Sequence, residues 1–263
     1  MKKALAFYRL LVILFLLSGC GPGPASELLA GLAEGCTAPG TVVSGDLPQP
    51  ARGYPYRYSV YLPPCFSPDG DDRYPVLYLV PGRNGAPDSW FAAGLAGAVD
   101  EMILAGDIRP FLIVTTENIG ADPLAVTISG ELIPSIEVQY PILRERRYQA
   151  VAGGSLGGIA AYRLAFQYPE TFSSAGIFGA GAIPGEEAQI RAWLSAMDED
   201  YPIRVFMDTG DEDLLMLDRA VVMKSMLDEA GIENLLHSGP GGHNYDYWVG
   251  NFEMYLRWMS RDW

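Results

Sequence analysis

The residue most able to act as a nucleophile is Ser155, which lies in the run Gly-Gly-Ser-Leu-Gly-Gly over residues 153–158. A short apolar stretch over 149–152 predicts a strand before the run, and apolar residues at helical spacing predict a helix after it. A serine on so cramped a turn needs glycines two residues to either side, and the turn lifts its hydroxyl out of the sheet. A phosphate-binding loop would require a lysine after the glycines, and this run has none. The run therefore indicates a nucleophilic serine, rather than a phosphate loop or a glycine turn that serves only packing.

A serine hydroxyl needs a base, and the chain has only two histidines. His243 ends the run Gly-Pro-Gly-Gly-His over 239–243, after the last predicted strand and before the last predicted helix. This place in the chain, with the serine first and acidic residues between, suits the base of a serine–histidine–acid triad. His237 falls inside the preceding predicted strand, so we expect it to be a structural or surface histidine.

The imidazole in turn needs a carboxylate, which fixes its tautomer and supports its positive charge. The acidic residues that follow the predicted strand over 205–207 are Asp208, Asp211, Glu212 and Asp213. We favour Asp213, because it lies three residues beyond Gly210 and is far enough past the strand to turn toward the histidine loop. Asp211 and Asp208 remain alternatives. An acidic residue here that is not the partner would cap a helix or lie in a solvated turn.

Attack on a carbonyl also needs backbone N–H donors for the oxyanion that forms. The amide of Leu156, at the start of the predicted helix, is one candidate. The amide of Arg83, in the loop Pro-Gly-Arg-Asn-Gly over 81–85, is the other, and the alternative for this loop is a plain turn. Trp90 and Trp248 are candidates for the wall of an acyl or alcohol pocket, although either tryptophan could instead belong to the core.

The elements that must position these residues alternate between strand and helix from about residue 76 onward. Strands are predicted over 57–62, 76–80, 111–115, 149–152, 175–178, 205–207 and 235–237. Helices are predicted over 90–104, 136–147 with an interruption at Pro141, 156–168, 186–197, 214–230 and from 244 onward. In the helix from 214, the residues on one predicted apolar face are Leu214, Leu217, Val221, Val222 and Met226.

This alternation predicts an α/β fold, with a mostly parallel central sheet and helices on both faces. The strand over 57–62 alternates polar and apolar residues, which predicts an antiparallel strand with one covered face. Ligands of such sheets bind beyond the carboxyl ends of the strands, where the candidate catalytic residues lie.

The N-terminus predicts export from the cytoplasm. The basic residues Lys2, Lys3 and Arg9 precede an apolar run over 10–17. This run is far shorter than the roughly 20 residues of a membrane-spanning helix. Leu-Ser-Gly-Cys over 17–20 resembles the lipobox of bacterial lipoproteins, whose cysteine becomes lipidated and N-terminal. The alternative is an ordinary cleaved signal with an incidental cysteine.

We therefore expect a lipoprotein signal peptide over 1–19, a tether and N-terminal segment over 20–54, and a catalytic domain over 55–263. The resemblance implies that acyl chains on Cys20 hold the enzyme on a membrane of the bacterial cell envelope, on its extracytoplasmic side. The formal net charge of −14 makes nucleic acid an unfavourable partner.

Setting Cys20 aside leaves Cys36 and Cys65, and an even pair in an exported protein suggests a disulfide. Such a bond would pin the N-terminal segment to the end of an early strand and stabilise the fold by about 3–4 kcal/mol. The alternative is two unpaired buried thiols. Two cysteines and two histidines at these spacings match no metal-ligand pattern, so no metal site is expected.

Further motifs carry a resemblance to a known family. Glu-Leu-Ile-Pro over 131–134, Tyr140, the serine run and Tyr-Pro-Glu-Thr-Phe over 168–172 resemble an esterase family of α/β-hydrolases. This family includes feruloyl esterases, enterochelin esterases, S-formylglutathione hydrolase and the mycolyltransferases. Gly-x-x-Asp over 210–213 and Gly-Gly-His-x-x-x-x-Trp over 241–248 look like its acid and histidine motifs. The likeness runs from about residue 55 to the end.

The resemblance implies the α/β-hydrolase fold, a triad of Ser155, Asp213 and His243, and oxyanion donors at Arg83 and Leu156. Many relatives carry His-Gly where this chain has Pro-Gly over 81–82, so the oxyanion loop departs from the pattern. The expected reaction is hydrolysis of an extracytoplasmic feruloyl, siderophore or small acyl ester, through an acyl-enzyme and without a cofactor. The alternatives are acyl transfer of the mycolyltransferase type and a non-catalytic surface lipoprotein. The mark of the latter would be a missing triad member, and none is missing.

Overall fold

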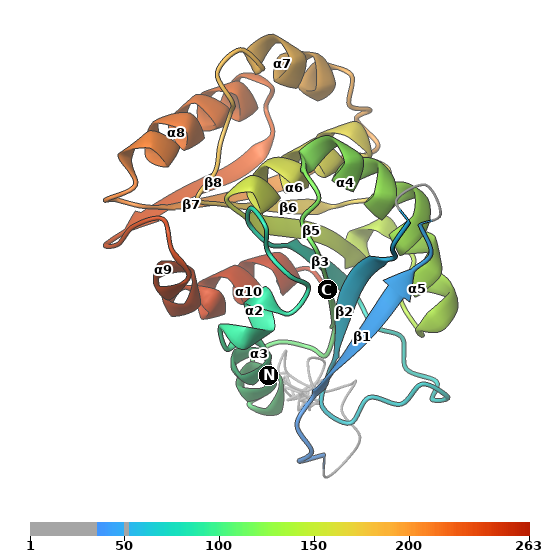
Figure 1. Ribbon diagram of the computed structural model, residues 1–263. Helices are drawn as coiled ribbons and strands as arrows, with labels where there is room; N and C mark the ends of the chain where they lie inside the picture. The colour runs from blue at the N-terminus through green and yellow to red at the C-terminus, as the bar shows by residue number, and fades with distance from the viewer. Residues whose placement is uncertain (1–35, 50–52) are drawn as a thin grey trace, which may run out of the picture.

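The computed structural model describes residues 36–49 and 53–263, and Figure 1 shows how their helices and strands are arranged. The predicted signal peptide and the predicted lipidation site at Cys20 lie outside the described residues. Within the described residues, no helix has both the length and the apolar character needed to cross a membrane.

The described chain is built on one eight-stranded sheet, with strand order β1-β2-β4-β3-β5-β6-β7-β8. The strands are β1 (Thr41–Leu47), β2 (Tyr56–Leu62), β3 (Val76–Val80), β4 (Leu112–Thr116), β5 (Gln149–Gly154), β6 (Ser174–Phe178), β7 (Arg204–Gly210) and β8 (Glu233–Gly239). The six strands from β3 to β8 run parallel to one another, whereas β1 and β2 pair antiparallel. The predicted α/β class with a mostly parallel sheet is confirmed.

The helices cover both faces of this sheet, as predicted. They are α2 (Ser89–Ala92), α3 (Leu95–Leu104), α4 (Ala121–Thr127), η1 (Ile128–Leu132), α5 (Ile133–Gln139), η2 (Arg146–Tyr148), α6 (Leu156–Gln167), α7 (Glu187–Ser195), α8 (Leu214–Glu229), α9 (Tyr245–Gly250) and α10 (Phe252–Ser260). Helices α4, α6, α7 and α8 lie on one face, and α2, α3, α9 and α10 lie on the other (Figure 1). The buried apolar residues accordingly form two clusters, one on each side of the sheet.

The first strand, β1, was not among the predicted elements. It is an edge strand whose residues are mostly exposed, so it carries no apolar run. It pairs along its whole length with β2, and Gly45 faces the ring of Tyr58, which leaves no room for a side chain. The sheet therefore begins before residue 55. The prediction of one covered face for β2 was wrong, because Ser59 and Tyr61 on its other face are also buried.

Three predicted helices differ in their extent. The helix predicted over 90–104 is two helices, separated at Gly94, which has a φ of 102°. The helix predicted from 136 is α5, which begins three residues earlier and ends at Gln139, ahead of Pro141. The C-terminal helix is divided at Asn251 into α9 and α10.

The predicted apolar face of α8 was wrong except at Met226, which is buried. Leu214 is 67% exposed and Val221 is 52% exposed. The residues that α8 buries are Ala220, Met223, Met226 and Leu227. The loop after β6 explains this orientation, because Gly181 approaches the backbone at residues 219 and 220 too closely for any side chain. A small residue must therefore face the loop, which turns Ala220 inward.

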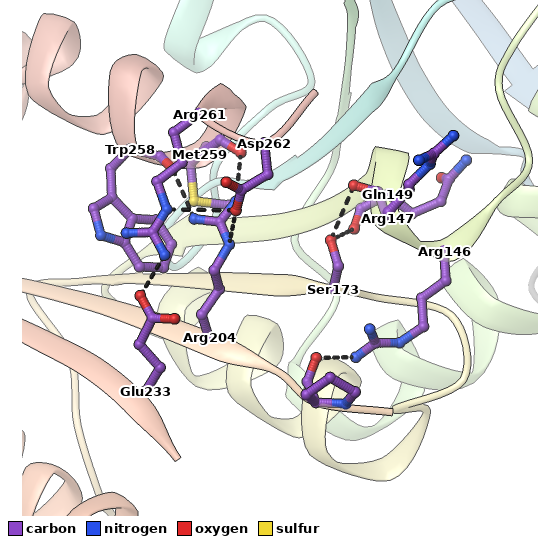
Figure 2. A network of polar contacts seen from close by, with 11 residues as sticks. Arg146, Arg147, Gln149, Ser173, Arg204, Glu233, Trp258, Met259, Arg261 and Asp262 are labelled. Carbon is purple, nitrogen blue, oxygen red and sulfur yellow. Dashed lines mark hydrogen bonds and ion pairs between the residues drawn. The ribbon is translucent and has the colours of Figure 1, made fainter. Parts of the chain in front are cut away.

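Arginine side chains bind the end of the chain to the sheet at the amino ends of the strands (Figure 2). Arg204, at the start of β7, donates to the carbonyl oxygens of Trp258 (2.9 Å) and Met259 (3.4 Å) and forms an ion pair with Asp262 at 2.9 Å. Its guanidinium carbon lies 4.6 Å from the centroid of the Trp258 ring. Helix α10 is thereby held against the sheet.

The structure contains the disulfide between Cys36 and Cys65 that the cysteine count suggested. Cys36 precedes β1 and Cys65 follows β2, so the bond joins the two strands at one end of the pair, where the start of β1 lies beside the end of β2. The bond closes a loop that spans 29 positions.

Candidate active site

Ser155 lies on the sharp turn between β5 and α6 that the glycine run predicts. Its φ of 56° and ψ of −122° are strained values for a residue with a side chain. The Ser155 amide donates to the Phe178 carbonyl at 2.7 Å, which ties the turn to the end of the neighbouring strand β6. A Cβ on Gly157 would collide with the Val80 carbonyl oxygen, and one on Gly153 would collide with the Gly157 backbone. The glycines are thus needed because strand and helix backbones touch at this turn.

His243 reaches the serine from the loop between β8 and α9. Its Nε2 lies 2.8 Å from the Ser155 Oγ, and its Nδ1 lies 2.6 Å from the Asp213 Oδ2. With the proton on Nδ1, the ring donates to the carboxylate and accepts from the serine hydroxyl. The His243 side chain is 35% exposed and that of Asp213 is 11% exposed, so a molecule from solvent can reach the imidazole. The structure therefore brings the three predicted triad residues into one hydrogen-bonded chain.

The alternative acids have other partners. Asp211 accepts a hydrogen bond from the Gly241 amide at 3.2 Å, and Asp208 pairs with His237 at 2.7 Å. Asp213 occupies the position before the first residue of α8, but its side chain caps no amide there. Its carboxylate is consequently left to His243.

The histidine loop packs tightly on the acid loop. The Glu212 amide donates to the Gly241 carbonyl at 2.9 Å, and Gly210 approaches that same carbonyl too closely for a side chain. Asn244 then begins α9 by accepting from the Tyr247 amide at 2.9 Å. These contacts fix both sides of the segment that carries His243.

Gly179 is a residue of this site that the sequence reasoning missed. It follows β6 with a φ of 54°, and a Cβ there would lie 3.0 Å from the Trp248 ring and 3.1 Å from the Cε1 and Nδ1 atoms of His243. Its amide also donates to the Asp208 carbonyl at 2.7 Å. The only local signal is a glycine at the carboxyl end of an apolar strand, and this signal does not reveal the contact with His243.

Trp90 and Trp248 are both buried, with 1% and 4% of their surfaces exposed. Their ring centroids are 5.7 Å apart, and Trp248 also meets the His243 ring edge to face at 5.4 Å. A Cβ on Gly154 would lie 3.0 Å from the Trp90 ring. The two tryptophans thus form the floor beneath the serine turn, and contact with a substrate stays a prediction.

The predicted oxyanion loop lies beside the serine, since a Cβ on Gly82 would be 3.4 Å from the Ser155 Cβ. Asn118, after β4, holds this loop: its side-chain amide donates to the Pro81 carbonyl at 2.7 Å and its backbone amide to that of Gly85 at 3.0 Å. Within the described chain, the amides of Arg83 and Leu156 donate to no acceptor. Their role as oxyanion donors stays a prediction. The role of Asn118 was not predicted, because its contacts are with a segment more than thirty residues away.

No group of three or more histidine, cysteine, aspartate or glutamate side chains among the described residues is arranged to hold a metal ion. The site instead contains a strained serine, an imidazole, a carboxylate and two free amides. Such a set can form and stabilise a tetrahedral adduct on a carbonyl carbon.

Comparison with known proteins gives a family match. The model of the family described as "Putative esterase" matches residues 50–259. The endo-1,4-beta-xylanase/feruloyl esterase of Xylanibacter ruminicola is 31% identical over 145 residues, which are 49% of this chain and 20% of the relative. The iron(III) salmochelin esterase of Escherichia coli is 27% identical over 211 residues, which are 70% of this chain and 51% of the relative. The chain thus spans from a fifth to about half of the length of these two relatives.

Solved structures show the same fold. A ferulic acid esterase superposes with a TM-score of 0.76 at 24% identity, covering 86% of this chain and 100% of the other. The S-formylglutathione hydrolase FrmB of Staphylococcus aureus gives a TM-score of 0.69 at 17% identity, covering 86% and 99%. The predicted α/β-hydrolase fold is confirmed.

Proposed function

The chain belongs to the esterase family, and we propose that it hydrolyses a carboxylic ester through a covalent acyl-serine intermediate. The observation that carries this proposal is the hydrogen-bonded chain from Asp213 through His243 to Ser155. The names of the relatives that match the chain are consistent with this reaction class.

In the first step, the Ser155 Oγ attacks the ester carbonyl while the His243 Nε2 takes the hydroxyl proton. Asp213 stabilises the imidazolium that results. The amides of Arg83 and Leu156 donate to the carbonyl oxygen as it becomes negative. When the adduct collapses, the C–O bond of the ester breaks, and His243 returns the proton to the leaving alcohol.

In the second step, water takes the place of the alcohol. His243 removes a proton from the water as it attacks the acyl carbon, and the proton then returns to the Ser155 oxygen as the free acid leaves. The partial exposure of His243 lets an acceptor from solvent reach the base. An added alcohol distinguishes transfer from hydrolysis: if the chain is an acyltransferase, a new ester should replace most of the free acid.

The test is a series of p-nitrophenyl esters of increasing acyl length, together with methyl ferulate as an ester of an aromatic acid. We expect Ser155→Ala to lower kcat by at least about ten-thousand-fold on the best substrate, with an unchanged circular dichroism spectrum. Ser195→Ala is the matched control, because Ser195 lies exposed on α7 and bonds only its own helix. Equal turnover by Ser155→Ala and wild type would exclude the proposal.

We also propose that the substrate is met outside the cytoplasm and that acyl chains on Cys20 hold the enzyme at a membrane. The supporting observation is the lipobox-like run over 17–20 after a basic and apolar lead. In a bacterial host, wild type should incorporate labelled palmitate and sediment with membranes, and Cys20→Ala should do neither. Label on Cys20→Ala equal to that on wild type would argue against lipidation at this residue.

A further inference from the structure

A second aspartate–histidine pair lies next to the proposed triad and is not used by it. The Asp208 side chain is fully buried, and its Oδ1 lies 2.7 Å from the His237 Nδ1. The Tyr247 hydroxyl donates to the same oxygen at 2.7 Å, and the Tyr255 hydroxyl donates to the other oxygen. A buried carboxylate without donors would be strongly destabilising, so these three partners are what allow it to lie there.

The positions of these partners in the chain are informative. His237 lies in β8 opposite Asp208 in the strand register, two residues before the glycine loop that carries His243. Tyr247 lies in α9, just after that loop. One carboxylate on β7 therefore binds a residue on each side of the segment over 239–244. We refer to Asp208, His237 and Tyr247 as the loop clamp.

The ring of Tyr247 reinforces this connection. A Cβ on Gly241 would lie 2.6 Å from a Tyr247 ring carbon, so the ring rests directly on the loop backbone. Tyr247 also donates its amide to Asn244, the residue after His243. Movement of the Tyr247 ring would thus be passed to the loop on both sides of His243.

We propose that Asp208 is a positioning residue, which acts through His237 and Tyr247 to hold His243 between Asp213 and Ser155. This inference rests on the proposed function, since it concerns the same base. Among the described residues, the clamp side chains make no hydrogen bond to Ser155; their hydrogen bonds join Asp208 to His237 and Tyr247. Its effect is on the placement of the imidazole, and a displacement of about 1 Å at a catalytic group can cost a hundredfold in rate.

The fold supplies a matched pair of variants. Tyr247→Phe removes the hydroxyl that ties α9 and the loop to Asp208, and Tyr255→Phe removes one from the other oxygen of the same carboxylate. Tyr255 lies on α10, outside the histidine loop. Both variants take one donor from a buried charge, so a purely structural role predicts equal effects on stability and turnover.

The first measurement is hydrolysis of p-nitrophenyl acetate, with unfolding in urea as the control for stability. We expect Tyr247→Phe to lower kcat by about ten- to a hundredfold with KM within twofold of wild type. Tyr255→Phe should lower kcat by less than about threefold, even if it lowers the urea midpoint as much. Equal losses of kcat in the two variants, or none in Tyr247→Phe, would overturn the clamp.

The second measurement does not depend on turnover. The chain has only two histidines, so ¹⁵N-histidine labelling gives two sets of imidazole signals, one for each ring, that Ser155→Ala also retains. Tyr247→Phe should shift the ring signals of both His237 and His243, whereas Tyr255→Phe should shift those of His237 alone. A His243 signal that does not respond to Tyr247→Phe would refute the clamp while the proposed function stands. Turnover that survives Ser155→Ala would instead refute the function, and with it the catalytic purpose of the clamp.

Discussion

Two aspartate–histidine pairs connect the carboxyl ends of β7 and β8, and they differ mainly in their surroundings. Asp213 and His243 are 30 residues apart, and Asp208 and His237 are 29 apart. In the first pair, the histidine also meets a strained serine at the surface. In the second, the aspartate is fully buried and meets two tyrosine hydroxyls. The same two residue types can therefore activate a nucleophile or hold a loop, depending on the third group that they face.

Substitution of the two histidines is expected to give the largest difference in kcat between the pairs. His243→Ala removes the base that is hydrogen-bonded to Ser155 and should lower kcat on p-nitrophenyl acetate by about ten-thousand-fold or more. His237→Gln keeps an N–H donor near Asp208 and should lower kcat by about tenfold at most. Steady-state kinetics of the two variants measures the contrast. Losses of similar size would mean that the pairs do not have separate roles.

Substitution of the two aspartates tests the same separation of roles by measuring both kcat and the free energy of unfolding. Asp213→Asn should lower kcat by about a thousand- to ten-thousandfold, because the histidine loses the partner that fixes its tautomer. Asp208→Asn should lower kcat less, by about ten- to a hundredfold, because it loosens the loop clamp. It should also lower the free energy of unfolding by about 2–4 kcal/mol, because it removes a buried charge that accepts three hydrogen bonds. Urea unfolding and kinetics should be measured on both proteins. A larger loss of kcat in Asp208→Asn would reverse the assignment.

Gly179 allows a sharper test of the exposed pair. Gly179→Ala places a Cβ 3.1 Å from the His243 ring at a φ of 54°, whereas Gly185→Ala meets the same kind of backbone at a φ of 93° with open space around it. Each should destabilise the fold by about 1 kcal/mol. Only Gly179→Ala should also lower kcat, by about tenfold. If Gly185→Ala lowers kcat equally, the effect comes from backbone strain and not from contact with His243.

The smallest expected effect is on stability at high pH, through Tyr255, which donates to the buried Asp208. Burial, and secondly the charge of Asp208, raises the pKa of Tyr255 well above its ordinary range. Below pH 10 the tyrosine is protonated in both states, so its contribution to stability is fully present. Above about pH 10 the unfolded chain loses this proton first, and stability falls by about 1.4 kcal/mol per pH unit for each such tyrosine.

Tyr255→Phe should therefore flatten the decline of the unfolding free energy between pH 10 and pH 11. Urea unfolding at a series of pH values measures this slope. The variant should also be less stable at pH 8, since Asp208 loses a donor there. An unchanged alkaline slope would mean that Tyr255 ionises equally in both states.

Local rules were enough to find the residues around Ser155. The strand, the glycine run and the helix lie within one continuous segment, and the need for Gly153 and Gly157 follows from backbone clearance alone. The place of His243 after the last strand was predicted in the same way. The parallel strands were also predicted, because their apolar runs are buried on both faces.

Residues whose roles depend on distant segments could not be found this way. Gly179 matters because of His243, more than sixty positions later, and Asn118 because of the loop at Pro81. The face of α8 was wrong for the same reason, since its orientation is set by contact with Gly181. The edge strand β1 carries no apolar pattern, since most of its residues are exposed.

The sequence by itself determined the order and the residue types of the candidate site: which serine can stand on a tight turn, which histidine follows it, and which strands must be buried. These are properties of short segments, governed by backbone sterics and hydrophobic pattern. Only the tertiary structure decided which aspartate serves which histidine. That choice depends on the register of β7 against β8 and on which carboxylate is covered by α9 and α10. Local sequence patterns do not reveal which distant segments come together or which side chains they bury. Burial and proximity are what distinguish the exposed aspartate–histidine pair from the buried one.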